Sequence, residues 1–183
     1  MINIAKKKLP KAVLAVIIYL SYCAMSMFTM RGSMAYYGQY YGFPSWFAND
    51  IWAFFLGGLV PFALYELFSS FGFKMIWARA GGDVASVKYG LGLTVIAANV
   101  FLALFKFVYL AIPLYAPVIN IMLDPIVTLA FVSGYMFYAF KQEYVEKARF
   151  RIVLTQVMSV FLIVYGALAL INLIMIFAQG AAV

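Results

Sequence analysis

Long runs of apolar residues, separated by short polar stretches, are the main pattern of this chain. Each run is long enough to cross the hydrocarbon core of a bilayer, which takes about 20 helical residues. Apolar side chains occupy all faces of the runs, as expected of helices that face lipid. The runs cover residues 11–30, 51–73, 91–112, 118–140 and 152–178. The pattern predicts an all-α integral membrane protein, a five-transmembrane-helix bundle that forms one transmembrane domain, 1–183.

Basic residues are distributed unevenly between the two sides of this predicted bundle. Eleven of the thirteen Lys and Arg residues fall on one side, and the connections of the other side hold only Arg31. Cytoplasmic loops are enriched in Lys and Arg, so we expect a cytoplasmic N-terminus and an outside C-terminus. The eleven are Lys6, Lys7, Lys8, Lys11, Lys74, Arg79, Lys88, Lys141, Lys147, Arg149 and Arg151. We place the chain in a bacterial cytoplasmic (inner) membrane, facing anionic headgroups.

The predicted connections are short. They comprise a basic cytoplasmic tail 1–10, an outer aromatic loop 31–50, and cytoplasmic loops 74–90 and 141–151. Asp50 and Asp83 are suited to cap the helices that follow them. Glu143 and Lys147 stand four residues apart, a spacing that favours continuation of the helix through the last loop. Pro61, with the glycines before it, predicts a kink in the second span.

Composition excludes several classes of protein. The chain is 67% hydrophobic and 10% charged, whereas soluble domains have about 25% charged residues. The net charge of +7 does not indicate nucleic-acid binding, because the cations sit at helix ends. The first run is longer than the core of a secretory signal, so we expect it to remain as a membrane anchor.

Catalytic and metal-binding motifs are missing from the sequence. The chain has no histidine and a single cysteine, Cys23, so the usual zinc, copper and haem ligand sets are lacking. A nucleophile–histidine–acid triad is excluded for want of its base. The sequence also lacks the glycine-rich phosphate loop of nucleotide hydrolases. We therefore predict a protein that is not an enzyme and needs no cofactor or metal.

Three ionisable residues lie within the predicted hydrocarbon region: Glu66, Lys106 and Asp124. Lys106 and Asp124 both fall about 10 Å from the outer end of adjacent antiparallel spans, which predicts an ion pair. Such a pair clamps the two helices together or provides an ion or proton step on a transport path. In a third interpretation, Lys106 reaches the outer interface on its own.

Other polar residues in the spans extend the list of candidates. Glu66 lies near the cytoplasmic end of its span, where it reaches the interface, pairs with Arg79 or Lys88, or forms an inner gate. Asn99 and Asn172 are suited to hydrogen bonds between helices. They also have the chemistry to line a polar cavity together with the charged residues.

The outer loop contains an unusual density of large aromatic rings. These are Tyr36, Tyr37, Tyr40, Tyr41 and Trp46. Tyr and Trp concentrate at membrane interfaces because their rings are apolar at one end and polar at the other. They also supply rigid contact area in protein interfaces. The loop is therefore a set of interfacial anchors or a partner-contact surface.

Function is inferred mainly from what the chain lacks. We expect a non-enzymatic subunit of a larger membrane complex of transport, secretion or respiratory type, docking through its helix faces and loops. Its partners would be other membrane subunits or further copies of itself. The alternative is a self-contained small-solute or ion transporter or channel that acts as an oligomer, and an enzyme acting on lipid is the third possibility.

Overall fold

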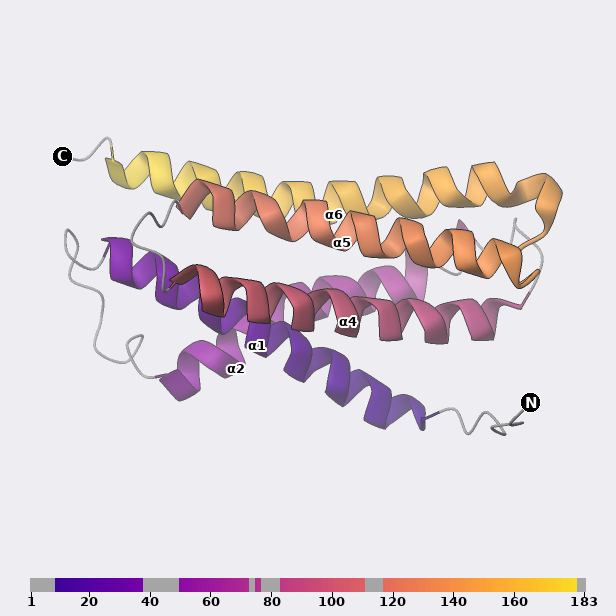
Figure 1. The fold of residues 1–183 in the computed structure, drawn as a ribbon, viewed down its shortest axis with the longest axis horizontal. Coiled ribbons are helices and arrows are strands. Elements are labelled where there is room, and N and C mark those ends of the chain that lie inside the picture. Colours follow the sequence, from indigo (N-terminus) through magenta and orange to yellow (C-terminus); the bar gives the residue numbers. More distant parts are fainter. Residues whose placement is uncertain (1–8, 38–49, 73–74, 77–82, 111–116, 181–183) are drawn as a thin grey trace.

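The computed structural model is a bundle of long helices that alternate in direction (Figure 1). It describes residues 9–37, 50–72, 75–76, 83–110 and 117–180. The long helices are α1 (Lys11–Tyr37), α2 (Asp50–Leu67), α4 (Val84–Leu110), α5 (Pro117–Lys141) and α6 (Phe150–Gly180), and the short ones are the π-helix η1 (Phe68–Gly72) and the 3-10 helix η2 (Lys147–Arg149). Within these described residues, five helices are long and apolar enough to cross a membrane, as the sequence predicts.

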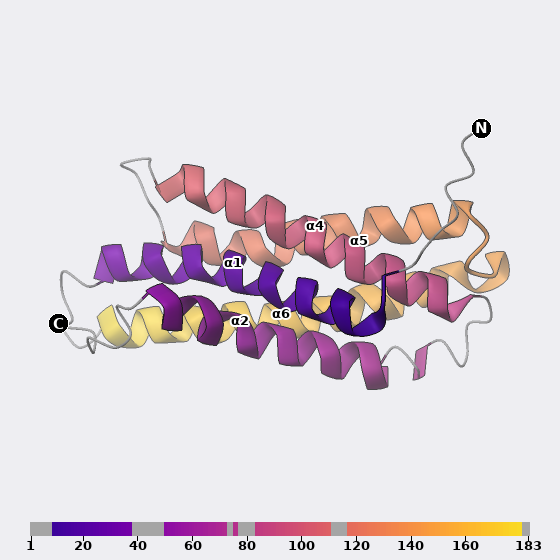
Figure 2. The same ribbon diagram turned by 90° about the horizontal axis from the view of Figure 1, so that it is seen from below.

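The helices pack in a curved row with α2 and α6 at its two edges. α1 packs against α2 and α4, and α5 packs against α4 and α6. Figures 1 and 2 show that the long helices lie side by side, with their axes roughly along the long axis of the bundle. We call the end where α1 and α6 begin and α5 ends the basic end, and the other the far end. Each half of the bundle is named after its end.

Two helices are longer than the apolar runs suggest. α1 continues to Tyr37, so the first part of the predicted loop 31–50 is helical. α4 begins at Val84, so the second part of the predicted loop 74–90 is helical as well. Asp83 caps this start, since its Oδ1 accepts a hydrogen bond of 3.1 Å from the Ser86 N–H. The cap predicted at Asp83 is thereby confirmed.

The connection between α5 and α6 differs from the sequence prediction. The predicted helical continuation through residues 141–151 is wrong, because α5 ends at Lys141 and a turn follows. The Tyr144 N–H donates to the Ala139 carbonyl and the Glu143 N–H to the Phe140 carbonyl, each at 3.0 Å. These two bonds form a Schellman motif, which needs a left-handed residue. Glu143 supplies it with a φ of 58°.

The basic half of the bundle has an apolar core. Its fully buried side chains come from α4, α5 and α6, and each is 0–1% exposed: Val87, Leu91, Val95, Val132, Met136, Val153 and Val157. The Phe140 and Phe150 rings pack at 4.3 Å between centroids where the two helices meet at the turn. Dispersion between these close-packed side chains is the main attraction holding this half together in lipid.

α2 is fixed to the bundle by a close approach to α1. A Cβ built on Gly58 would lie 2.7 Å from the Cys23 backbone nitrogen, so only glycine fits there. Pro61 lies inside α2, and the helix changes direction along its course in Figure 2. The helix ends in η1, where Phe68 packs against Phe161 of α6 at 5.2 Å between ring centroids.

Candidate functional site

An ion pair joins α4 and α5 in the far half of the bundle. Lys106 Nζ lies 2.5 Å from Asp124 Oδ1, and the two side chains are 1% and 19% exposed. Lys106 Nζ also donates a hydrogen bond of 2.5 Å to Thr29 Oγ1 of α1. The ion pair is thus the predicted one, and its third partner ties a third helix to it.

Burial makes this ion pair sensitive to the loss of either member. A charged residue at the centre of a bilayer costs about 2.5–3.5 kcal/mol on insertion scales. The pair offsets this cost only while both charges are present. Lys106 and Asp124 interact as opposite charges and not through a well-aligned hydrogen bond. Among the described residues, Asp124 Oδ1 has no hydrogen-bond donor of suitable geometry.

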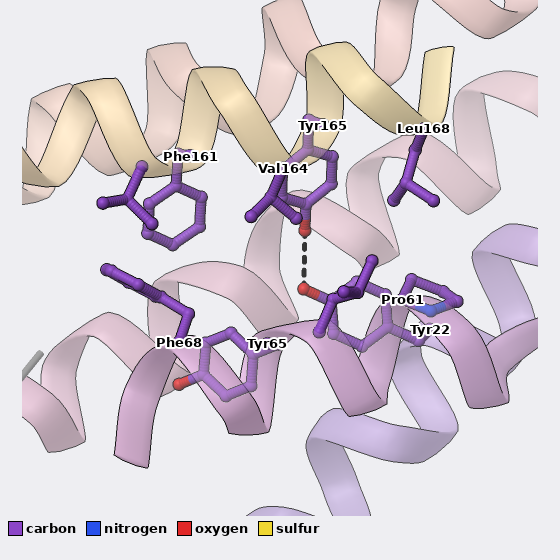
Figure 3. A pocket seen from close by; sticks show the side chains of 10 residues that line it. Tyr22, Pro61, Tyr65, Phe68, Phe161, Val164, Tyr165 and Leu168 are labelled. Carbon is purple, nitrogen blue, oxygen red and sulfur yellow. Dashed lines mark hydrogen bonds between the residues drawn. The ribbon is translucent and has the colours of Figure 1, made fainter. Parts of the chain in front are cut away.

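Two tyrosines meet hydroxyl to hydroxyl deeper in the bundle. Tyr22 of α1 and Tyr165 of α6 lie 2.5 Å apart between their oxygens, and either one can be the donor. Both side chains are buried, with exposed fractions of 0% and 5%. Figure 3 shows the two rings approaching each other from opposite helices. The bond joins α1 to α6, which packs mainly against α5.

Asn99 forms a second polar contact with α1. Its Nδ2 donates a hydrogen bond of 3.0 Å to Ser21 Oγ, and both side chains are buried. The Asn99 side chain also lies beside the Tyr22 hydroxyl. Tyr165 in turn lies beside Thr128 of α5 and interacts electrostatically with Asp124.

These contacts form one continuous group, which we call the polar cluster. Its members are Ser21, Tyr22, Thr29, Asn99, Lys106, Asp124, Thr128 and Tyr165. They come from α1, α4, α5 and α6. Chemically, the cluster holds one carboxylate, one ammonium and a chain of hydroxyl and amide groups, so it has the means to hold and reorient protons.

Three polar atoms of the cluster lack a hydrogen-bond partner within the described part of the chain. They are Asn99 Oδ1, Asp124 Oδ1 and Thr128 Oγ1, and Asn99 and Thr128 are 0% exposed. A buried polar atom without a partner costs about 1–3 kcal/mol.

A small cavity lies between α2 and α6, against the tyrosine pair. Its lining is almost wholly apolar apart from tyrosine hydroxyls (Figure 3). The lining residues are Tyr22, Pro61, Leu64, Tyr65, Phe68, Val160, Phe161, Val164, Tyr165 and Leu168. Its volume is about 10 Å³, room for about one water molecule. The cavity is therefore too small for a larger solute.

Glu66 stands apart from the polar cluster. It lies in the last turn of α2 and is half-buried, and its backbone carbonyl accepts a hydrogen bond of 3.3 Å from Ser69 Oγ. Among the residues that the structure describes, Glu66 takes part in no ion pair. Of its two predicted partners, Lys88 lies in α4, and Arg79 falls outside the described residues.

The other predicted site residues are only partly described. The backbones of Tyr36 and Tyr37 form the last turn of α1, and that of Asn172 belongs to α6. Their side chains lie outside the described part of the structure. Tyr40, Tyr41 and Trp46 lie outside it altogether. The aromatic loop therefore stays a prediction.

Sequence reasoning missed five of the eight cluster residues, above all Tyr22 and Tyr165. The signal was present, since both tyrosines stand near the middle of apolar runs, whereas tyrosine normally gathers at the membrane interface. A mid-span tyrosine needs a hydrogen-bond partner inside the bundle. The hydroxyls of Ser21, Thr29 and Thr128 carry no comparable signal, because Ser and Thr usually bond to their own helix.

The described residues contain no group of three or more His, Cys, Asp or Glu placed to hold a metal ion. Comparison of the chain with protein-family models, with characterised proteins and with solved structures gives no match.

Proposed function

We propose that the chain is a non-enzymatic subunit of a larger membrane assembly of transport, secretion or respiratory type. The carrying observation is a contrast between glycines. Gly58 and Gly90 lie against Cys23 and Tyr135, whereas a Cβ at Gly134 would meet nothing within 4 Å. Gly134 lies on the exposed face of α5, one turn after the exposed Ala130.

Helix association in membranes favours such small residues, because they let two backbones approach closely. Inside this chain the close approaches are already used for folding. Gly166 of α6 is equally open, but Gly134 also lies one turn from a second exposed small residue, Ala130. Such an open pair on an outward face lets another transmembrane helix pack closely. The filled interior, with a cavity of about 10 Å³, also favours assembly over conduction by one copy.

The orientation of the subunit is part of the proposal. Six of the described basic residues, Lys11, Lys88, Lys141, Lys147, Arg149 and Arg151, lie at or near the basic end, whereas Lys106 is paired with Asp124 in the far half. By the positive-inside rule this end faces the cytoplasm, next to anionic headgroups, in a bacterial inner membrane. Cysteine labelling at positions 39 and 142 in a Cys23→Ser background tests it. Labelling of position 142 from outside intact cells contradicts the orientation.

A second candidate function is supported by the polar cluster. An ionisable pair inside a membrane bundle is a common feature of ion and proton pathways. In this alternative, an oligomer of this chain forms a pathway that reaches the buried ion pair from the partly exposed side of Asp124. This alternative predicts flux through the purified chain in liposomes, whereas the subunit proposal predicts none.

The test uses substitutions at two exposed small residues. Gly134→Leu fills the open face of α5, and Ala63→Leu places the same side chain at an exposed position of α2. Purification in mild detergent should yield the wild-type chain with companion polypeptides or further copies, Gly134→Leu without them, and Ala63→Leu with them. A wild-type chain that runs as a monomer and moves an ion in liposomes contradicts the subunit proposal and supports the transporter.

A further inference from the structure

The outward face of α6 carries a regular pattern that packing within the chain does not use. The buried residues of this helix, such as Val153 and Val157, belong to the core, and the opposite face is exposed. On that face six residues follow one another at steps of four and three, the spacing of the seam in a two-stranded coiled coil. They are all exposed or partly exposed, and we call them the α6 seam: Ile152, Gln156, Ser159, Ile163, Gly166 and Leu170.

Two members of the α6 seam are polar, although they lie within an apolar span. Gln156 and Ser159 follow the last basic residue of the chain, Arg151, by about 8 and 12 Å along the helix axis. Among the described residues, neither side chain has a hydrogen-bond partner. The neighbouring Thr155 differs, because its hydroxyl donates to the Arg151 carbonyl at 2.9 Å. Polar groups at this depth are stabilised by a hydrogen bond to another helix, and no described helix of this chain provides one.

The chemistry of these two side chains indicates what packs against them. An amide has donor N–H groups and an acceptor oxygen, and a hydroxyl also both donates and accepts. Two Gln156 side chains can therefore bond to each other, which two lysines or two glutamates cannot. Copies of one membrane protein insert in the same orientation, since the same loop charges orient each of them. Their α6 helices then run parallel, and across a two-fold axis each residue meets its own counterpart.

We propose that a second copy of this chain packs on the α6 seam and that Gln156 forms a hydrogen bond with its counterpart there. Ser159, one turn further along, supplies a second such pair. Gly166 lets the two backbones approach, because a Cβ built on it would meet nothing within 4 Å. Ile152 and Ile163, which are 60% and 69% exposed, supply apolar side chains that interdigitate with those of the second copy. The face is accessible because α6 lies at one edge of the bundle.

The α6 pair goes beyond the subunit proposal, because it concerns a different helix and a different kind of contact. The open face of α5 around Gly134 consists of small residues and accepts any helix that packs closely. The α6 seam instead selects a second copy through its self-complementary polar groups. Gly134→Leu releases only what packs on α5, so this variant should retain the α6 pair. The two proposals therefore succeed or fail separately.

Cysteine cross-linking of the full chain in native membranes tests the α6 pair. In a Cys23→Ser background, Ser159→Cys places a single thiol on the α6 seam, and mild oxidation should join two copies into a band of twice the chain mass. The control is Ala97→Cys, since Ala97 is exposed on α4, which packs against α1 and α5. Equal yields of the joined pair from the two positions overturn the proposal. Linkage of Ser159→Cys only to a different polypeptide overturns it as well.

Substitution of Gln156 tests the hydrogen bond itself and needs no introduced cysteine. Resonance energy transfer between differently labelled copies in liposomes, at a fixed ratio of protein to lipid, measures the pairing. Gln156→Leu should weaken pairing about fivefold, the scale of one hydrogen bond between helices in a membrane. Gln156→Asn keeps the amide and should pair nearly as well as the wild-type chain. If Gln156→Leu pairs as strongly as the wild-type chain, the proposal is overturned, and the amide serves only to reach the cytoplasmic interface.

Discussion

The two halves of this bundle are held together by different forces. In the basic half, the buried side chains of α4, α5 and α6 are apolar. In the far half, the same helices and α1 meet through an ion pair, a tyrosine pair and an amide–hydroxyl bond. Packing energy is spread over many small contacts, whereas a polar contact depends on both partners being present. The halves should therefore fail in different ways when they are mutated.

The largest effect is expected at the ion pair. Lys106→Met leaves Asp124 without its counter-charge and should lower the free energy of unfolding by about 3 kcal/mol, the lower end of the range for buried pairs. This end applies because Asp124 is 19% exposed. Unfolding in mixed micelles measures the loss. Adding Asp124→Leu should recover much of it, and a double variant as unstable as the sum of the singles contradicts the coupling.

In the apolar half, the loss of unfolding free energy should depend on how much side-chain volume a substitution removes. Leu91→Ala removes a side chain that is 1% exposed and should cost about 2–3 kcal/mol through the cavity that it leaves. Leu91→Met preserves volume and should cost less than about 1.5 kcal/mol. Both are read in the same unfolding assay. If the alanine and methionine variants are equally unstable, the basic half depends on a specific contact rather than on filled space.

The close approach of two helix backbones is a third kind of contact. Substitutions at two glycines test it separately from the other two kinds. Gly58→Ala places a methyl group against the Cys23 backbone and should cost about 1–3 kcal/mol by overpacking. Gly134→Ala meets open space and should be neutral or slightly stabilising, because alanine favours the helix by about 1 kcal/mol. Equal unfolding free energies for the two variants would show that α1 and α2 separate without penalty.

The smallest effect is expected at the turn of the basic end. Glu143→Gly relieves the left-handed conformation and should raise the unfolding free energy by up to about 1 kcal/mol. The substitution also removes the exposed ion pair with Lys147, at 3.4 Å. This loss reduces the gain in unfolding free energy by only about 0.3 kcal/mol. Glu146→Gly is the control, because Glu146 has an ordinary φ of −63°. Glu146→Gly should not raise the unfolding free energy. An increase equal to that of Glu143→Gly refutes the strain argument.

The helices and the ion pair were easier to predict from the sequence than the last turn and the tyrosine pair. Run lengths are enough to predict five apolar helices, and antiparallel depth is enough to pair Lys106 with Asp124. The turn after Lys141 was misjudged, because helix-supporting charge spacing gave no hint that Glu143 adopts the backbone conformation of a glycine. Tyr22 and Tyr165 belong to the first and last spans, and no local pattern relates residues that lie 143 positions apart.

The hydroxyl bond between α1 and α6 has a consequence for biosynthesis. Tyr22 enters the membrane with the first helix, and its partner Tyr165 is synthesised 143 positions later. During this interval its hydroxyl has only temporary neighbours, such as Asn99 once α4 arrives. The emergence of Tyr165 from the ribosome supplies the missing partner and joins the first helix of the nascent protein to the last. A chain truncated before Tyr165 should therefore form an open intermediate that proteases cleave readily. Its first helix should still be able to separate from the other helices.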